Sequence, residues 1–222
     1  MDPALIQKLA VYALPVIFAI TLHEAAHGYV AKRFGDKTAW MLGRVTLNPL
    51  KHIDPVGTVL VPVMIVLMSS GDFLFGWAKP VPVNFGALRR PKKDMLWVAA
   101  AGPGANFLMV LGWALLFKLA LVMPEQPYAE AMKAMGRAGV GVNTSLMLLN
   151  LLPLPPLDGG RIAVSLLPMR AAVSFSRIEP YGMWVLLLLL FWKIDGISIL
   201  GYILYVPQGI LEVLVMTIFG LR

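Results

Sequence analysis

The residues His23-Glu24-Ala25-Ala26-His27 form the most reactive pattern in this chain of 222 residues. Side chains four positions apart lie on the same face of an α-helix, so the imidazoles of His23 and His27 can bind one Zn²⁺ ion. Glu24 follows the first histidine and can reach a water molecule at that metal, where its carboxylate acts as general base. Such a short pattern also occurs by chance, as a polar stripe at a helix end. The rest of the sequence has to distinguish the two interpretations.

A catalytic zinc ion usually has three protein ligands and one position for water, so a third ligand must come from elsewhere. Because the chain has no cysteine, this ligand must be His, Asp or Glu. The best candidate is Asp158, which follows the proline-rich stretch Asn150 to Leu157 and precedes Gly159-Gly160. Asp-Gly is also a frequent turn dipeptide, so a structural role for Asp158 stays open at this point. His52 is a further candidate, but its position in a basic loop favours a surface or structural role.

The composition places this chemistry in a membrane. Counted with its 20 Gly and without its 6 Tyr, the apolar share is about 65%, against roughly 45–50% in soluble domains. Charged residues make up 14% of the chain, which excludes intrinsic disorder, and the net charge is +7. The basic residues lie between long apolar runs, so membrane topology explains them better than nucleic-acid binding. We therefore expect an all-α polytopic membrane protein, in which a carboxylate such as Glu24 is costly and hence a functional candidate.

Stretches without Asp, Glu, Lys or Arg mark the expected membrane helices, because about 20 helical residues cross the hydrocarbon layer. The first helix is expected to begin at Asp2-Pro3 and to run to about Phe34. The other stretches cover 55–71, 95–117, 138–157, 180–192 and 196–211. The sequence thus predicts about five to six transmembrane helices in a single domain, 1–222. Its catalytic core is expected over about 4–160 and its C-terminal helices over about 178–221.

The segment 55–71 decides the expected topology. It contains Pro55 and Pro62, which suit a re-entrant segment that returns to the same side. With the N-terminus outside, a re-entrant segment places 14 of the 19 Lys and Arg residues on the cytoplasmic side, whereas a full crossing divides them 9 to 10. The positive-inside rule therefore favours the re-entrant topology. In that topology Asp158 and the histidine motif lie on the same side of the membrane, and a full crossing would separate them.

Two further segments have distinctive patterns. Residues 77–85 contain two prolines and alternating valines, which favour an extended, β-like hairpin or edge strand over a helix. In the run 95–117, Gly102, Gly104 and Asn106 are interpreted as residues for close helix packing, with Asn106 bonded to a neighbouring helix, rather than as part of the chemistry.

Four motifs stand in a distinctive order: His23 to His27, Gly76 to Val83, Ala101 to Asn106, and Asn150 to Gly160 with Leu157-Asp158-Gly159. Together they resemble the site-2 proteases, the intramembrane zinc metalloproteases of peptidase family M50. The similarity is to the minimal type without PDZ or CBS domains. It covers residues 23 to 160, and the order of the motifs is more specific than any one of them alone.

This resemblance implies His23, His27 and Asp158 as the ligands of one Zn²⁺ and Glu24 as the catalytic base. It implies that Asn150 is catalytic and binds the substrate backbone or the tetrahedral oxyanion, a charge that a preorganised amide donor suits. An interhelical hydrogen bond is the alternative role for Asn150. The resemblance also implies that the segment 76–83 guides an extended substrate, although a proline-rich surface hairpin explains that pattern equally well.

The expected function is hydrolysis of a peptide bond in or near the transmembrane segment of a membrane-protein substrate. The substrate helix must unwind locally, and pairing with an edge strand at Val81, Val83 and Asn84 would achieve this. We expect the plasma membrane of a prokaryote, a site towards the cytoplasm, and as partners the lipid bilayer and a substrate with a transmembrane helix, with no nucleic acid. The alternative is a non-proteolytic membrane protein that binds or transports metal, which predicts further acidic or histidine residues along a path through the membrane.

Overall fold

The computed structural model describes residues 3–61, 64 and 78–221. Helices dominate this part of the chain, and its sheet is a single two-stranded hairpin. The α-helices are α1 (Pro3–Arg33), α2 (Thr38–Met41), α4 (Pro91–Val122), α5 (Ala129–Leu151), α6 (Asp158–Leu166), α7 (Met169–Ser176), α8 (Glu179–Phe191) and α9 (Ile199–Ile218). Short 3₁₀ or π segments cover η1 (Pro49–Lys51), η2 (Pro55–Leu60) and η3 (Phe85–Ala87). The predicted all-α membrane architecture is confirmed.

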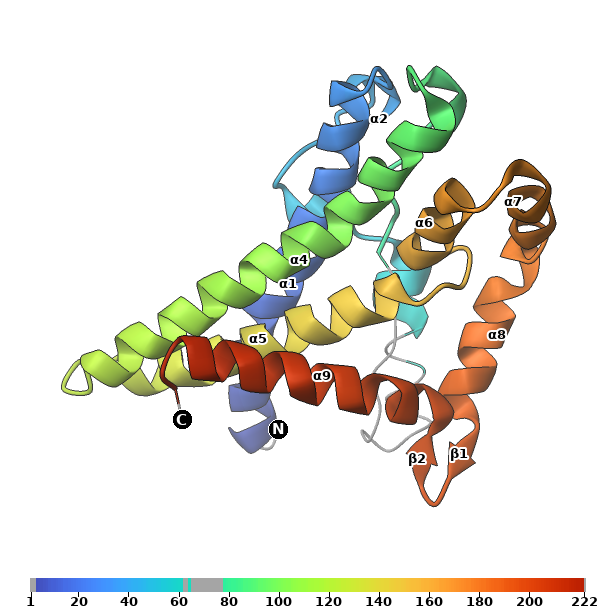
Figure 1. Cartoon of the computed structure of the whole chain (residues 1–222). Helices are drawn as coiled ribbons and strands as arrows, with labels where there is room; N and C mark the ends of the chain where they lie inside the picture. The colour runs from blue at the N-terminus through green and yellow to red at the C-terminus, as the bar shows by residue number, and fades with distance from the viewer. Residues whose placement is uncertain (1–2, 62–63, 65–77, 222) are drawn as a thin grey trace.

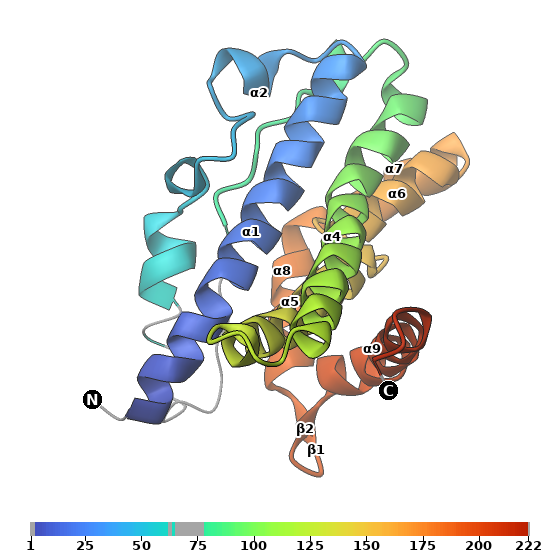
Figure 2. The ribbon, with the colours of Figure 1, turned by 90° about the vertical axis from the view of Figure 1, so that its left-hand side faces the viewer.

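Three long helices form the centre of the fold. Helices α1, α4 and α5 all pack against one another, α6 packs on α4, and α9 packs on α5 (Figure 1, Figure 2). The absence of a side chain at Gly139 brings α5 close to α4, because a Cβ there would lie 2.2 Å from the ring of Trp113. A buried cluster of Val110, Ala114, Val140 and Val215 joins α4, α5 and α9. This packing holds α1 and α4 side by side, and the candidate site lies between them.

In the part of the chain that the structure describes, three helices are long and apolar enough to cross a membrane, namely Ile6–Arg33, Pro91–Val122 and Ile199–Ile218. A fourth span results if α7 and α8, which meet at an angle of 61°, are taken together. Within the described residues these helices account for three or four of the predicted five to six crossings. The full number of crossings stays a prediction.

The predicted helix 138–157 has different ends in the structure. Helix α5 begins earlier, at Ala129, and ends at Leu151. It cannot continue because Pro153, Pro155 and Pro156 lack the N–H group that an inner helical position donates. The chain turns back over 152–157, and α6 begins directly afterwards at Asp158. A Cβ on Gly159 would lie 2.2 Å from the carbonyl oxygen of Leu151, so this return requires glycine.

The hairpin occurs at a different place from the one predicted. Residues 78–84 contain no β-strand and run beside α1 (Figure 2). The hairpin joins β1 (Lys193–Ile194) to β2 (Ile197–Ser198), with Asp195 and Gly196 at φ values of 50° and 82° in the turn. Asp-Gly adopts such positive φ values readily and is a strong hairpin signal. Of the predicted re-entrant segment 55–71, residues 62–63 and 65–71 lie outside the described residues, as do Gly76 and Trp77.

Candidate metal centre

Three side chains that are far apart in the sequence converge between α1 and the start of α6. The Nε2 atoms of His23 and His27 are 3.1 Å apart, and Asp158 Oδ2 lies 3.2 Å and 3.3 Å from them. All three residues are buried. Ligand atoms about 2.0–2.1 Å from a tetrahedral zinc ion are roughly 3.3 Å apart, so these separations match the edges of such a coordination sphere.

The hydrogen bonds of the two rings leave their Nε2 atoms free to coordinate. His27 Nδ1 donates to the carbonyl oxygen of Val98 at 2.7 Å, and His23 Nδ1 lies 2.6 Å from Asn106 Oδ1. A carbonyl or amide oxygen only accepts hydrogen bonds, so each Nδ1 carries the proton and each neutral ring has its lone pair on Nε2. Two lone pairs and a carboxylate oxygen then face one another. Among the described residues Asp158 Oδ2 has no hydrogen-bond donor, and a cation would satisfy all three groups.

Gly102 of α4 forms one wall of this cluster. A Cβ at that position would lie 2.4 Å from His27 Nε2 and 2.6 Å from His23 Nε2, the two atoms that face Asp158. A Cβ on Gly104 would meet nothing within 4 Å. Gly102 was expected to serve helix packing outside the chemistry. The structure instead places it directly against both imidazole rings.

We call the three residues His23, His27 and Asp158 the metal cluster. Glu24 lies beside them and is held by the extended segment 78–84. Its Oε2 accepts a hydrogen bond of 2.7 Å from Val81 N–H. The two residues share a pocket of about 340 Å³ with the metal cluster. That pocket is lined by His23, Glu24, His27, Pro80, Val81, Pro82, Val83, Phe85, Val98, Ala99, Asn150, Pro156, Leu157, Asp158 and Arg161.

The structure brings most of the predicted site residues into this one pocket. Asn150 lies in its wall, and its Nδ2 donates to the carbonyl oxygen of Leu146 in its own helix, with no bond to another helix among the described residues. Val81 and Val83 also line the pocket, whereas Asn84 does not. Asn84 has a local role instead, because its Oδ1 accepts from Gly86 N–H at the start of η3.

Two buried asparagines that sequence reasoning did not assign to the site are connected to it. Asn106 bonds to a metal-cluster residue, His23, and also to Asn143 of α5 at 3.0 Å. The signal that could have identified Asn106 is its amide in a run of 23 uncharged residues, where a polar group needs a specific partner. His52, by contrast, is buried, donates from Nε2 to the carbonyl oxygen of Thr46 at 3.0 Å, and is not part of the cluster.

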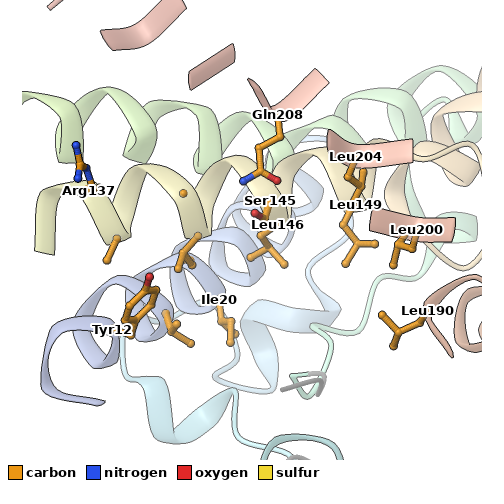
Figure 3. Close-up of a pocket in the computed structure, with 15 residues that line it drawn as sticks. Tyr12, Ile20, Arg137, Ser145, Leu146, Leu149, Leu190, Leu200, Leu204 and Gln208 are labelled. Carbon is orange, nitrogen blue, oxygen red and sulfur yellow. The ribbon is translucent and has the colours of Figure 1, made fainter. Parts of the chain in front are cut away.

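A second cavity, of about 510 Å³, lies further towards the N-terminal end of α1 (Figure 3). Helices α1, α5, α8 and α9 form it, with Tyr12 and Ile20 from α1 and Leu190, Leu200 and Leu204 from the C-terminal helices. We call it the apolar cavity. Its polar lining groups include Arg137, Ser145 and Gln208, and none of the metal-cluster residues reaches it.

The family comparison agrees with this geometry. The family model described as peptidase family M50 matches residues 11–192. The chain belongs to peptidase family M50. A predicted zinc metalloprotease of Bacillus subtilis, YwhC, is 39% identical over 179 residues, which are 79% of this chain and 78% of that protein.

The predicted zinc metalloproteases named Rip2 are more distant relatives. That of Mycolicibacterium smegmatis is 32% identical and that of Mycobacterium tuberculosis 30%, each over 143 residues, 64% of this chain and 52% of the relative. No solved structure matches the chain. Family membership and the apolar helices together make this chain an integral membrane protein of a zinc metalloprotease family.

Proposed function

We propose that this M50 member is a zinc-dependent intramembrane endopeptidase, which hydrolyses a peptide bond in or near the transmembrane segment of another membrane protein. The observation that carries the proposal is the convergence of His23, His27 and Asp158 beside Glu24 in a single pocket. These three residues would hold one Zn²⁺ per chain. When bound, the ion supplies a Lewis acid and makes water a stronger nucleophile at neutral pH.

Glu24 is the proposed general base. Val81 N–H holds its Oε2, so the carboxylate has a defined orientation in the pocket. In the described part of the chain, Oε1 accepts no hydrogen bond from protein and can take a proton from the attacking water. The same carboxylate can then deliver that proton to the leaving nitrogen of the cleaved peptide bond.

The prolines of the segment 78–84 leave one edge of this segment to pair with a substrate strand, namely the edge opposite to them. Alternate residues of an extended chain present their backbone groups to the same edge. Pro80 and Pro82 have no N–H, and Asn84 N–H donates to Asp36 Oδ2 at 2.7 Å, so this edge offers no free donor. The other edge carries Val81 N–H, bonded to Glu24, and Val83 N–H, which has no partner among the described residues. An unwound substrate that paired there would lie beside the metal cluster.

Asn150 can orient the substrate carbonyl. An amide group has two N–H donors, and only one is used in the described structure, by the carbonyl of Leu146. The second donor can bind the oxygen on which negative charge develops. Asn150 can bind this oxygen because it lies in the pocket wall. It is on the last turn of α5, just before the chain turns back to Asp158.

The proposed location is the plasma membrane of a prokaryote with the pocket towards the cytoplasm. Two observations support this orientation. Helix α1 ends in Lys32 and Arg33, close to the histidine motif, and 14 of the 19 basic residues fall on that side in the re-entrant topology. The proximity of Asp158 to His23 also supports that topology, because a full crossing of 55–71 would separate them.

Metal transport is less well supported than proteolysis. A transport path needs successive coordinating groups through the membrane. Within the described residues, His23, His27 and Asp158 form the one group of three or more candidate ligands. A single metal site beside a general base suits hydrolysis of a peptide bond better than transport of metal ions across the membrane.

The decisive experiment compares the purified chain with its Glu24→Gln variant. Both should bind one equivalent of zinc, since the glutamate is not a ligand. The variant should cleave a model single-span substrate at least about 100-fold more slowly, because it lacks the base. Glu212→Gln in α9 is the matched control, since Glu212 bonds to Gln208 outside the pocket, and should retain activity. Equal cleavage by wild type and Glu24→Gln would overturn the mechanism.

A further inference from the structure

The two metal-cluster histidines are held by different kinds of partner. His27 Nδ1 donates to a backbone carbonyl of α4, that of Val98. His23 Nδ1 instead donates to a side chain, the amide of Asn106, also in α4. A backbone carbonyl in a helix has a constant direction, whereas an asparagine amide can rotate or exchange its oxygen and nitrogen. The orientation of His23 therefore depends on what holds Asn106.

Asn106 is held by two further hydrogen bonds. Its Nδ2 donates to the carbonyl of Ala19 in α1 at 3.2 Å and to Oδ1 of Asn143 in α5 at 3.0 Å. The Nδ2 of Asn143 in turn donates to the carbonyl of Gly139 at 2.9 Å. Both asparagines are completely buried, with exposed fractions of 0%. The network thus joins all three central helices at the level of His23.

The two backbone carbonyls determine which way each amide faces. Because the carbonyl of Gly139 only accepts, Asn143 must direct its nitrogen there and its oxygen towards Asn106. Because Ala19 O and Asn143 Oδ1 both only accept, Asn106 must direct its nitrogen to them and its oxygen to His23. Oδ1 of Asn106 can then only accept a hydrogen bond, so the proton of the His23 ring must be on Nδ1. Reversal of either amide would set two acceptors against each other in an apolar interior.

We propose that Asn106 and Asn143 are positioning residues that hold His23 as the Nδ1–H tautomer, with Nε2 directed at the metal. Outer partners of this kind orient metal-binding histidines and raise their basicity. The inference rests on the proposed metal site and extends it to two residues that touch neither metal nor substrate. Asn143 acts through Asn106, and Asn106 acts through His23.

Zinc affinity of the full chain in detergent, measured by competition with a chromophoric chelator, tests the proposal. Asn106→Leu should bind zinc about 10- to 100-fold more weakly, and Asn143→Leu should lose less, because Ala19 still holds Asn106. The double variant should be no weaker than Asn106→Leu, since the residues act in series. Thr144→Val is the matched control: Thr144 is equally buried beside Asn143, and its hydroxyl has no partner in the described part of the chain.

Nitrogen NMR of the metal-free protein with ¹⁵N-labelled histidine gives a second readout that a merely structural role would not change. The chain has only three histidines, so the signals can be assigned by substitution. His23 should be protonated at Nδ1 in the wild type and in Thr144→Val, and should become a mixture of tautomers in Asn106→Leu. In Asn143→Leu the second tautomer should appear as a smaller fraction, because Ala19 alone then holds the Asn106 amide. This measurement also applies if Asn106→Leu fails to fold.

The outcomes separate this proposal from the proposed function. If the wild-type chain binds no zinc, the metal site itself is wrong, and the tautomer measurement alone decides the role of the asparagines. If wild type binds zinc and Asn106→Leu binds it equally well, the positioning role is overturned while the metal site stands. Two further results would contradict the proposal that Asn143 acts on His23 through Asn106. One is additive losses of zinc affinity in the double variant, and the other is an unchanged His23 tautomer in Asn143→Leu.

Discussion

The pocket of the metal cluster and the apolar cavity share helices α1 and α5 but differ in the polar groups that they offer. The apolar cavity is the larger, at about 510 Å³ against about 340 Å³. Helix α1 contributes Tyr12, Val16 and Ile20 to the larger one, and His23 and Glu24, one turn further on, to the smaller. The surroundings of the helix thus change from hydrophobic side chains to candidate metal ligands within a single turn. The volume of a cavity therefore does not identify the candidate metal site, whereas the convergence of atoms that can bind a metal does.

The difference follows from the elements that form each wall. The apolar cavity lies among α1, α5, α8 and α9, whose leucines offer no partner to a charge (Figure 3). The pocket adds α4, the start of α6 and the extended segment 78–84, each of which brings backbone or side-chain polar groups to α1. Ionisable side chains are stable in this interior only because these additional elements provide their hydrogen-bond partners.

Among substitutions in the two regions, Gly102→Ala should reduce zinc binding most. The new methyl group would lie 2.4 Å from His27 Nε2, so it would occupy the space the metal needs. Zinc affinity should fall by more than the roughly 10- to 100-fold that loss of an outer partner causes. Gly104→Ala is the control, because its Cβ meets nothing within 4 Å. Chelator competition measures both, and equal affinities would show that Gly102 does not border the metal.

An intermediate effect is expected from Val83→Pro, which removes the free N–H of the substrate-facing edge. One hydrogen bond contributes about 0.5–1.5 kcal/mol, so cleavage of a single-span substrate should slow by about 2- to 12-fold. Zinc affinity should not change, because Val83 is not a ligand. Val83→Ala retains the N–H and serves as the control in the same cleavage assay. A similar loss in Val83→Ala would attribute the effect to side-chain packing rather than to strand pairing.

The smallest effect is expected from Ser145→Leu, which fills part of the apolar cavity. Ser145 lies two residues after Asn143 on α5 but lines the cavity instead of the asparagine network. Zinc affinity should change by less than about twofold, as for substitutions away from the site. The chelator assay that is used for Gly102→Ala measures this. A loss as large as that of Gly102→Ala would mean that the apolar cavity is coupled to the metal site.

Helix-forming segments were predictable because their signals are local. The uncharged run 95–117 lies within α4, and the start at Pro3 and the end near Phe34 agree with α1. The end of α5 was predicted six residues too late, although the prolines that terminate it were visible in the sequence. A run without charges indicates where a helix can lie, but the backbone donors that proline lacks decide where it stops.

Two Asp-Gly pairs show the limit of local signals. Asp195-Gly196 forms the turn of the hairpin, whereas Asp158-Gly159 begins helix α6 and directs a carboxylate to the histidines. The dipeptide permits both outcomes. Gly159 is packed against the carbonyl of Leu151, a contact that no local pattern records.

Local patterns in the chain were enough to predict the class of protein and to restrict the candidate metal ligands. Composition implies a membrane, helical periodicity pairs His23 with His27, and the lack of cysteine restricts the remaining ligand to His, Asp or Glu. The packing of the helices was needed to show that Gly102 borders the metal cluster while Gly104 does not, and that Asn106 bonds to His23. These facts depend on how α4 lies against α1 across 83 positions of sequence, and such contacts arise only when the helices pack.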